Sequence, residues 1–405
     1  MGLHALLAPS SAGRWLLCTR SARAEESFPE STSDAAEEGT VAHSLGEAMI
    51  RVKTGMISKK EYKFILEGRP ATKKTEAVPG IKEDRFYCEA MHEHCENYSD
   101  YVVERYMLAR KKTSDAILFV ERLLDMSKYV LESFGTGDVI IIADGTLEFI
   151  DLKYGKGVPV SAIGNKQLRM YALGAVTEFD FLYDISDVRM VIYQPRLDSV
   201  SIDTMSYTDL VEWGETILRP AAELAFAGEG EFVPGDHCRF CKVRYECTAL
   251  AERNMTISEY VERDASLIPL DKISEILALS GDITKWLTGF KEYWIKKVLE
   301  GAELPNLKLV NGKGARILTD PDKIESILVA NNYSTDKILK PKELYGITEL
   351  TKVVGKKKLD ELIGSLIVHK DGAPTLVSTE DSRPAFEQPD PFAVPFAEPE
   401  EHDFL

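Results

Sequence analysis

An acidic and a basic residue stand two positions apart at the end of an apolar run near the middle of the chain. The stretch DVIIIADGTLEFIDLKYGKG spans residues 138–157, and its second apolar run ends at Asp151, Leu152 and Lys153. Side chains at i and i+2 of a strand point to the same face, so the Asp151 carboxylate and the Lys153 ammonium are expected side by side. An exposed ion pair would explain this spacing and would contribute little stability. The alternative is a hydrolytic site, in which the ammonium steadies an attacking water and the charge developing on a phosphate.

A second carboxylate precedes this pair. Asp138 follows Gly137 in the sequence GTGD, which we place at the start of the preceding strand, one turn away from Asp151. In an antiparallel pair joined by a turn, the start of one strand lies beside the end of the next. Two carboxylates can therefore converge, and such hard oxygen ligands bind Mg²⁺ or Mn²⁺. Gln167 and Tyr171 follow, one helical turn apart, so that both can face the same cleft.

Taken in order, four segments of the chain resemble a nuclease family. They are GTVAHSLGE, GTGD, DLK and QLRMY. This order is similar to the H…GxxD…DxK…QxxxY series of the RecB-like branch of the PD-(D/E)XK nuclease superfamily. The resemblance covers about residues 1–250, and a reading as solvated charges around a core histidine remains open.

This resemblance assigns roles to the residues of the series. It implies that His43, Asp138 and Asp151 ligate the catalytic metal, with help from the backbone carbonyl of Leu152. It also implies that Lys153 is the catalytic lysine. Gln167 and Tyr171 would position DNA or the lysine.

Three cysteines stand close together in the stretch CRFCKVRYEC. The spacing is Cys238-x₂-Cys241-x₅-Cys247, which is compact but is not a usual zinc-finger pair. Three thiolates leave a metal site one ligand short. Zinc completed by His237, or by Cys88 and Cys95, is one solution.

The same resemblance supplies another solution. RecB-like nucleases such as AddB and some CRISPR-associated nucleases carry one remote N-terminal cysteine and a C-terminal trio, which hold a [4Fe–4S] cluster. The resemblance implies that Cys18 is the fourth ligand here and that the cluster has a structural role. Four cysteines are the expected ligand set of such a cluster, and this one would close a very long loop.

The elements that must position these residues can be read from hydrophobic patterning. We predict a short helix from Ser10 or Ser11 through Trp15 and Cys18, and a helix that carries His43. Further helices are expected over 84–106, 161–179, 207–228 and 283–298, and strands over 116–126, 138–152 (two strands), 188–195 and 199–207. The predicted fold class is α/β, with a PD-(D/E)XK restriction-endonuclease-like core, in which helices flank a central mixed sheet. A small α/β accessory region is expected over 305–382.

Composition bounds the class of protein. The chain has 405 residues, 44% of them hydrophobic, and a formal net charge of −17. Six cysteines without a recognisable export signal indicate reduced thiols or metal ligands. No apolar run is long enough to span a membrane. We therefore expect a cytoplasmic protein, in a bacterial host cell, with a nuclease domain at 1–250, an accessory region at 251–383 and a tail at 384–405.

The tail has an unusual composition. Residues 384–405 contain six acids, five prolines and no Lys or Arg, which predicts disorder. Four phenylalanines, Phe386, Phe392, Phe396 and Phe404, interrupt the acids. A docking segment for a phage single-strand annealing or single-strand DNA-binding protein is one interpretation, and a solubilising tail is the other.

The sequence thus predicts a Mg²⁺- or Mn²⁺-dependent DNA nuclease, with exonuclease activity favoured. Over its whole length the chain also resembles an uncharacterised family of phage and prophage proteins, which implies a role in phage DNA recombination or replication. Two alternatives stay open. One is a cluster-bearing DNA-binding or scaffold protein that does not cleave, and the other is a zinc-binding adaptor.

Overall fold

The computed structural model describes residues 5–29, 32–71, 76–261, 263–264, 266, 268–307 and 355–358. The predicted tail at 384–405 lies outside these residues, as does the predicted small α/β region at 305–382 apart from residues 305–307 and 355–358. Within the described part of the chain, no helix is long and apolar enough to cross a membrane.

Five strands form one mixed sheet in the order of the sequence, β1-β2-β3-β4-β5. They are β1 (Ile117–Asp125), β2 (Phe134–Ala143), β3 (Gly145–Leu152), β4 (Ile185–Gln194) and β5 (Ser199–Ser206). Only the β3–β4 pair is parallel, and the crossover between these two strands contains α6 (Lys166–Phe179). The predicted central mixed sheet is therefore confirmed.

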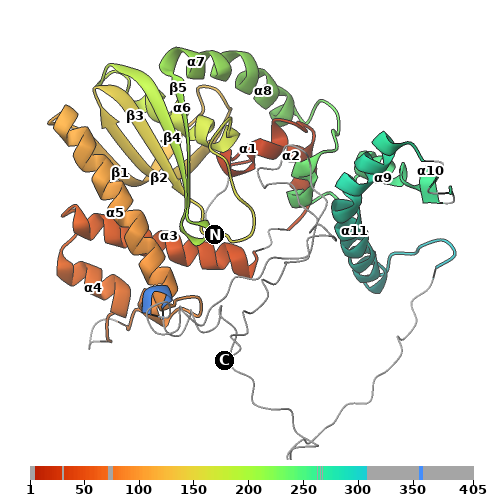
Figure 1. The fold of residues 1–405 in the computed structure, drawn as a ribbon, viewed down its shortest axis with the longest axis horizontal. Coiled ribbons are helices and arrows are strands. Elements are labelled where there is room, and N and C mark those ends of the chain that lie inside the picture. The colour runs from red at the N-terminus through yellow and green to blue at the C-terminus, as the bar shows by residue number, and fades with distance from the viewer. Residues whose placement is uncertain are drawn as a thin grey trace, which may run out of the picture.

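Helices cover both faces of this sheet (Figure 1). On one face lie α3 (Asp34–Lys53) and α5 (Glu89–Lys112), which pack on apolar side chains such as Val139 and Ile141 of β2. On the other face lie α1 (Ala12–Trp15), α6, α7 (Tyr207–Trp213) and α8 (Arg219–Ala227). There, Ile140 and Ile142 of β2 enter the larger core cluster. This strict alternation along β2 is what a strand buried on both faces requires.

The remaining helices lie around this core. They are α2 (Ser21–Glu25), α4 (Lys59–Glu67), α9 (Thr248–Met255), α10 (Ser258–Val261) and α11 (Leu270–Leu299). Short 3-10 helices span Pro9–Ser11, Ile81–Glu83, Pro195–Leu197 and Asp236–Phe240, and a π-helical segment over Gly214–Leu218 joins α7 to α8. Figure 1 places α9, α10 and α11 beyond α1 and α2, away from the sheet.

Several boundaries differ from the predicted ones. Helix α5 begins at Glu89 instead of residue 84, because Ile81–Glu83 form a separate 3-10 helix. Helix α6 begins at Lys166 instead of residue 161, because the Asn165 side chain accepts a hydrogen bond from the Leu168 N–H and caps the helix there. The first helix ends at Trp15, before Cys18.

The position of Asp138 is also corrected. The strand β2 begins at Phe134, so Asp138 lies inside the strand and not at its start. Its partner strand β1 continues alongside as far as the pair of Asp125 with Phe134. The turn-based argument nevertheless places Asp138 next to the end of β3, as the site geometry shows.

Candidate active site

The Asp151–Lys153 pair lies at the end of β3, inside the sheet. Lys153 Nζ is 2.6 Å from Asp151 Oδ2, and the two side chains are 28% and 4% exposed. Asp151 is flanked by β4, where it pairs with Ile192. This is not an exposed surface ion pair, so that alternative is excluded. Burying a carboxylate in this way is costly unless its charge is compensated.

Asp138 links β2 to this end of β3. Its Oδ2 accepts a hydrogen bond of 2.7 Å from the backbone N–H of Leu152. The same oxygen lies 3.4 Å from Nδ1 of His43 on α3. The carboxylate therefore holds the strand end that carries Asp151 and Lys153, and it meets a helix from the opposite layer.

Gly137 makes room for this arrangement. A Cβ at this position would lie 2.6 Å from a ring carbon of Phe149, a fully buried residue of β3. The Phe149 ring stacks on Tyr171 of α6 with a centroid separation of 5.1 Å. The glycine of the GTGD segment therefore has a packing reason as well as a place in the motif.

Glu121 of β1 is a member of the site that the sequence did not suggest. Its carboxylate oxygen lies 3.9 Å from Nδ1 of His43. It stands opposite Asp138, since Val120 pairs with Val139 and Arg122 with Gly137 on either side. Its φ is +52°, in the left-handed region that non-glycine residues rarely adopt. Strained backbone of this kind concentrates at functional sites.

The left-handed backbone conformation at Glu121 changes which face of the sheet the following side chains of β1 occupy. Leu118 and Val120 enter the core cluster beneath α3 and α5, whereas Leu124 enters the cluster beneath α6. Strict alternation would keep all three on the same face. The alternation therefore slips between Val120 and Leu124, at the position where Glu121 meets Asp138.

The three residues form a candidate cation site. In the described part of the chain, His43, Glu121 and Asp138 are the group whose ligand atoms all lie within 4.8 Å of one another. Asp151, which the resemblance implied as a ligand, is outside this group and is paired with Lys153. Two carboxylates and an imidazole suit a divalent ion such as Mn²⁺ or Mg²⁺.

Electrostatics support a cation here. Burial lowers the pKa of His43, but hydrogen bonding to Asp138 and Glu121 outweighs it and raises the pKa to about 10. Burial raises the pKa of Asp151, and the nearby Lys153 opposes that shift. The buried Oδ2 of Asp151 lies 2.6 Å from Lys153 Nζ. The carboxylates of Glu121, Asp138 and Asp151 outnumber the two cationic side chains beside them, and this excess of negative charge fits a bound divalent cation.

Tyr171 and Gln167 approach the same cluster from α6. Burial raises the pKa of the Tyr171 phenol, as do the carboxylates of Asp151 and Asp138, while hydrogen bonding with Gln167 opposes the shift. The Tyr171 ring stacks on Phe149 of β3, and its hydroxyl would lie 3.2 Å from a Cβ at Gly135 of β2. The structure therefore brings the predicted residues of β2, β3 and α6 together at one place.

A second site is lined by cysteines. Cys18, Cys238, Cys241 and Cys247 all line one cavity, together with His237 and apolar side chains. The two backbone N–H groups of Val233 and Gly235 donate hydrogen bonds of 3.4 Å to the sulfurs of Cys18 and Cys238. Cys18 thus meets the trio across a sequence separation of more than two hundred residues, as the resemblance implied.

The spacing of the cysteine sulfurs can be compared with that of a closed zinc site. Around a tetrahedral zinc with Zn–S bonds of about 2.3 Å, thiolates lie about 3.8 Å apart. Among the described residues, no three of these four sulfurs lie within 4.8 Å of one another. His237 is also engaged, since its Nε2 lies 2.9 Å from the carbonyl oxygen of Val233. The four-thiol donor set is that of an iron–sulfur cluster, and zinc can use the same thiols once they draw together.

Cys88 and Cys95 do not join this cavity. Cys95 is fully buried beneath α3, and its thiol donates to the carbonyl of Ala42. Cys88 occupies the N-cap position of α5 and packs against the same small core cluster. These two cysteines belong to the packing of α3 against α5, so they are not the completing ligands of the trio.

A comparison with protein families decides where the chain belongs. The model described as "Protein of unknown function (DUF2800)" matches residues 4–384. The chain belongs to the DUF2800 family. This agrees with the expected membership of an uncharacterised family, while the phage association stays a prediction.

Two solved structures show remote similarity to this DUF2800 protein. One is named "Putative exonuclease", from Eubacterium rectale, with 13% identity, a TM-score of 0.32, and coverage of 64% of this chain and 93% of that one. The other is SSO0001, with 12% identity, a TM-score of 0.21, and coverage of 59% and 96%. Similarity at this level does not carry an argument about fold or activity, which rest here on the geometry.

Glu121 and Tyr98 are the site residues that sequence patterning missed. The Tyr98 hydroxyl, on α5, is buried without a hydrogen-bond partner in the described part of the chain, and the charges of Asp138 and Asp151 help burial to raise its pKa. The only local signal for Glu121 was a charged residue within the apolar run FVERLL. A single charged residue in a strand is common, so Glu121 is recognised as a site residue only from its position opposite Asp138.

Proposed function

We propose that this DUF2800 protein is a divalent-metal-dependent DNA nuclease, with an exonuclease favoured by the RecB-like resemblance. One observation carries the proposal. His43, Glu121 and Asp138 converge beside the buried Asp151–Lys153 ion pair. Charged side chains without a function are usually exposed to solvent, and a cluster of them buried at a strand end is typical of a functional site.

The residues divide the work of phosphodiester hydrolysis. A divalent ion, when bound, lowers the pKa of a water and offsets phosphate charge. His43, Glu121 and Asp138 would hold that ion, and Asp151 lies beside them because the Leu152 N–H at the end of β3 donates a hydrogen bond to Asp138. Lys153 can donate a hydrogen bond to the attacking water or to a non-bridging phosphate oxygen. Tyr171 and Gln167 are placed to orient the strand or the Lys153 ammonium.

The test is a cleavage assay with end-labelled single- and double-stranded DNA. The protein is incubated with Mg²⁺ or Mn²⁺, and the products are resolved by length. We expect divalent-dependent shortening that a chelator abolishes and that Lys153→Ala removes. Equal cleavage by the Lys153→Ala protein would sink the proposal.

We further propose that Cys18, Cys238, Cys241 and Cys247 hold a [4Fe–4S] cluster with a structural role. Four buried or half-buried thiols with backbone N–H donors support it. Anaerobically purified protein is expected to be brown and to contain iron. A colourless protein with one equivalent of zinc would instead support the adaptor hypothesis.

A role in phage DNA recombination or replication belongs to the same proposal, as does docking of a single-strand annealing or single-strand DNA-binding protein on the acidic tail. Support comes from the resemblance and from the composition of residues 384–405. Deleting that segment should weaken co-purification of the partner. Unchanged co-purification, DNA affinity and cleavage would leave the tail a solubilising segment.

A further inference from the structure

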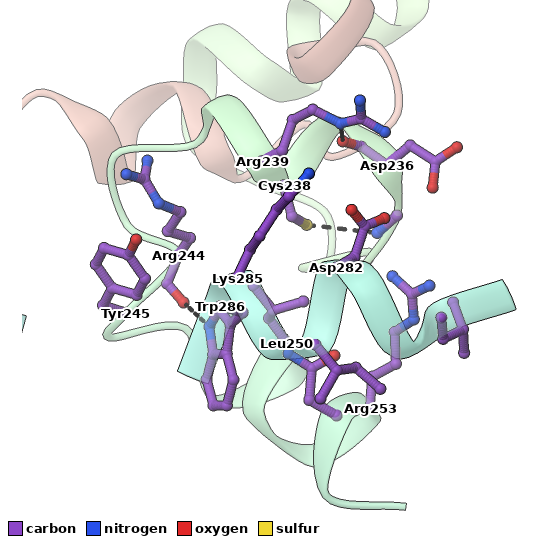
Figure 2. A pocket seen from close by; sticks show the side chains of 14 residues that line it. Asp236, Cys238, Arg239, Arg244, Tyr245, Leu250, Arg253, Asp282, Lys285 and Trp286 are labelled. Atoms are coloured by element: carbon purple, nitrogen blue, oxygen red, sulfur yellow. Dashed lines mark hydrogen bonds between the residues drawn. The ribbon is translucent and has the colours of Figure 1, made fainter. Parts of the chain in front are cut away.

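A concave pocket lies between α11, α9 and the 3-10 helix over Asp236–Phe240 (Figure 2). We call it the basic pocket. Its polar and aromatic lining residues used below are Arg239, Arg244, Arg253, Asn254, Lys285 and Trp286. It is distinct from the carboxylate cluster, with which it shares no residue, but it shares Cys238, Arg244 and Leu250 with the cysteine-lined cavity.

The cations of the basic pocket lack carboxylate partners. Arg239 and Arg244 donate only to the backbone carbonyls of Asp236 and Cys241. Arg253 and Lys285 make no hydrogen bond or ion pair with any described residue. Some arginines elsewhere pair with acids, as Arg105 and Arg189 do with the buried Glu148. In a chain of net charge −17, four cations without an ion-pair partner in the lining of one concavity favour an anion there.

Two carboxylates also line the pocket, and they do not neutralise it. Neither Asp236 nor Asp282 lies within ion-pair distance of a cation among the described residues. In Figure 2, Asp282 and Lys285 both project from α11 toward the loop that carries Cys238. The lining still has two more cations than carboxylates.

Two further side chains equip the pocket. Asn254 is 8% exposed, and its side-chain amide, which hydrogen-bonds to none of the described residues, can donate to an anion in the pocket. Trp286 is fixed by a hydrogen bond of 2.9 Å from its Nε1 to the carbonyl oxygen of Arg244. Its indole ring packs on Phe290 with a centroid separation of 4.8 Å and also lines the pocket beside the cations.

The size of the pocket limits the ligand. Its volume is about 190 Å³, below the range of about 300–1,000 Å³ typical of pockets that enclose a whole cofactor. It therefore suits one anionic group of a larger molecule that passes across it. Arginine and lysine side chains around one group are the usual way to bind a backbone phosphate.

The geometry points to the basic pocket as a binding site for a backbone phosphate of the DNA strand, outside the catalytic cluster. This rests on the proposed function, since that function makes DNA the substrate. The phosphate is held by Arg253 and Lys285, with Arg239, Arg244 and Asn254 around it. Because Cys238 is in the wall, the strand would pass beside the cysteine-lined cavity.

The test measures DNA binding without cleavage. Full-length Lys153→Ala protein is titrated with fluorescent single- and double-stranded DNA in chelator at several salt concentrations. Adding Arg253→Ala and Lys285→Ala should weaken binding by roughly tenfold at about 0.1 M salt and lower the slope of log K against log salt by about 0.9. Lys291→Ala, on α11 but not lining the pocket, is the matched control and should change neither quantity.

The outcomes separate this inference from the nuclease proposal. Pocket-dependent binding, together with no cleavage by the parent protein in Mg²⁺ or Mn²⁺, would support the site and sink the nuclease. Unchanged affinity and slope in the double variant would overturn the site, whatever the cleavage result. Stabilisation by inorganic phosphate that the double variant loses, with DNA binding unchanged, would also overturn it in favour of a free anion. Lys285→Glu, a change at an exposed position, repeats the test if the double variant folds poorly.

Discussion

The carboxylate cluster and the cysteine-lined cavity are built in opposite ways. Except for His43, the cluster draws its charged residues from β1 to β3 and the residue that follows, within positions 121–153. The cavity joins Cys18 to cysteines beyond residue 237. One site is set by strand register over short distances, and the other depends on bringing the two ends of the folded core together.

The two regions also differ in what stabilises them. The cluster concentrates carboxylates that repel one another and a left-handed Glu121, so the protein alone stabilises it poorly. The contact between chain ends consists of a few hydrogen bonds, including those from Arg14 to the carbonyl of Phe240 and from Arg23 to the carbonyl of Phe226, with the four cysteines beside them. We therefore expect the loss of a charged residue to cost activity at the cluster and the loss of a cysteine to cost integrity at the cavity.

The largest effect is expected at the cluster. Asp151→Asn or Lys153→Ala should reduce DNA cleavage by at least about a thousandfold, because each removes a charge that acts on the reacting phosphate or its cation. Iron content should change little in either variant, and the melting temperature should change little for Asp151→Asn. Lys153→Ala should lower the melting temperature, because it leaves the Asp151 carboxylate buried without its partner. Cleavage rates and thermal unfolding of the same preparations check this, and loss of stability together with activity in the Asp151→Asn protein would mean that the pair is only structural.

The next effect is expected at the cavity. Cys18→Ser should remove most of the bound iron and leave the protein poorly soluble, as strongly as Cys241→Ser does, because either change leaves three ligands. Cys88→Ser is the control, since Cys88 lies at the α5 N-terminus outside the cavity. Iron content and soluble yield are the measurements. Full iron in the Cys18→Ser protein would exclude the remote fourth ligand.

This contrast explains what the sequence could predict. The five strands, the Asp151–Lys153 contact and the approach of Asp138 to the β3 end follow from period-two patterning and short connections, which sequence shows directly. The meeting of Cys18 with the trio depends on long-range closure, and only the family resemblance suggested it. The sequence did not predict a role for Glu121, because that role depends on its left-handed backbone conformation. No local pattern in FVERLL indicates such a conformation.

A smaller effect is expected where the cluster meets the core. Gly137→Ala would place a Cβ 2.6 Å from the buried Phe149 ring, which stacks on Tyr171. Overpacking of this kind costs about 1–3 kcal/mol, and the displaced ring should shift Tyr171 and slow cleavage. Gly13→Ala is the control, because nothing lies within 4 Å of a Cβ there. Denaturant unfolding of both variants measures the difference, and equal stability would mean that the ring can move away freely.

The smallest effect concerns the strain at Glu121, and two substitutions isolate it. Both Glu121→Gly and Glu121→Ala remove the carboxylate that faces His43 and Asp138. Both should therefore lower the affinity for the divalent ion and slow cleavage to a similar extent. Only glycine adopts a φ of +52° without steric cost. Without divalent ions, the free energy of unfolding of the glycine variant should therefore exceed that of the alanine variant by about 1 kcal/mol. Removing a carboxylate from a crowded acidic cluster should also lift its stability above that of the parent, at the expense of activity. Equal stability of the two variants in denaturant unfolding would show that the backbone relaxes at this position and that the strand stores no strain for the site.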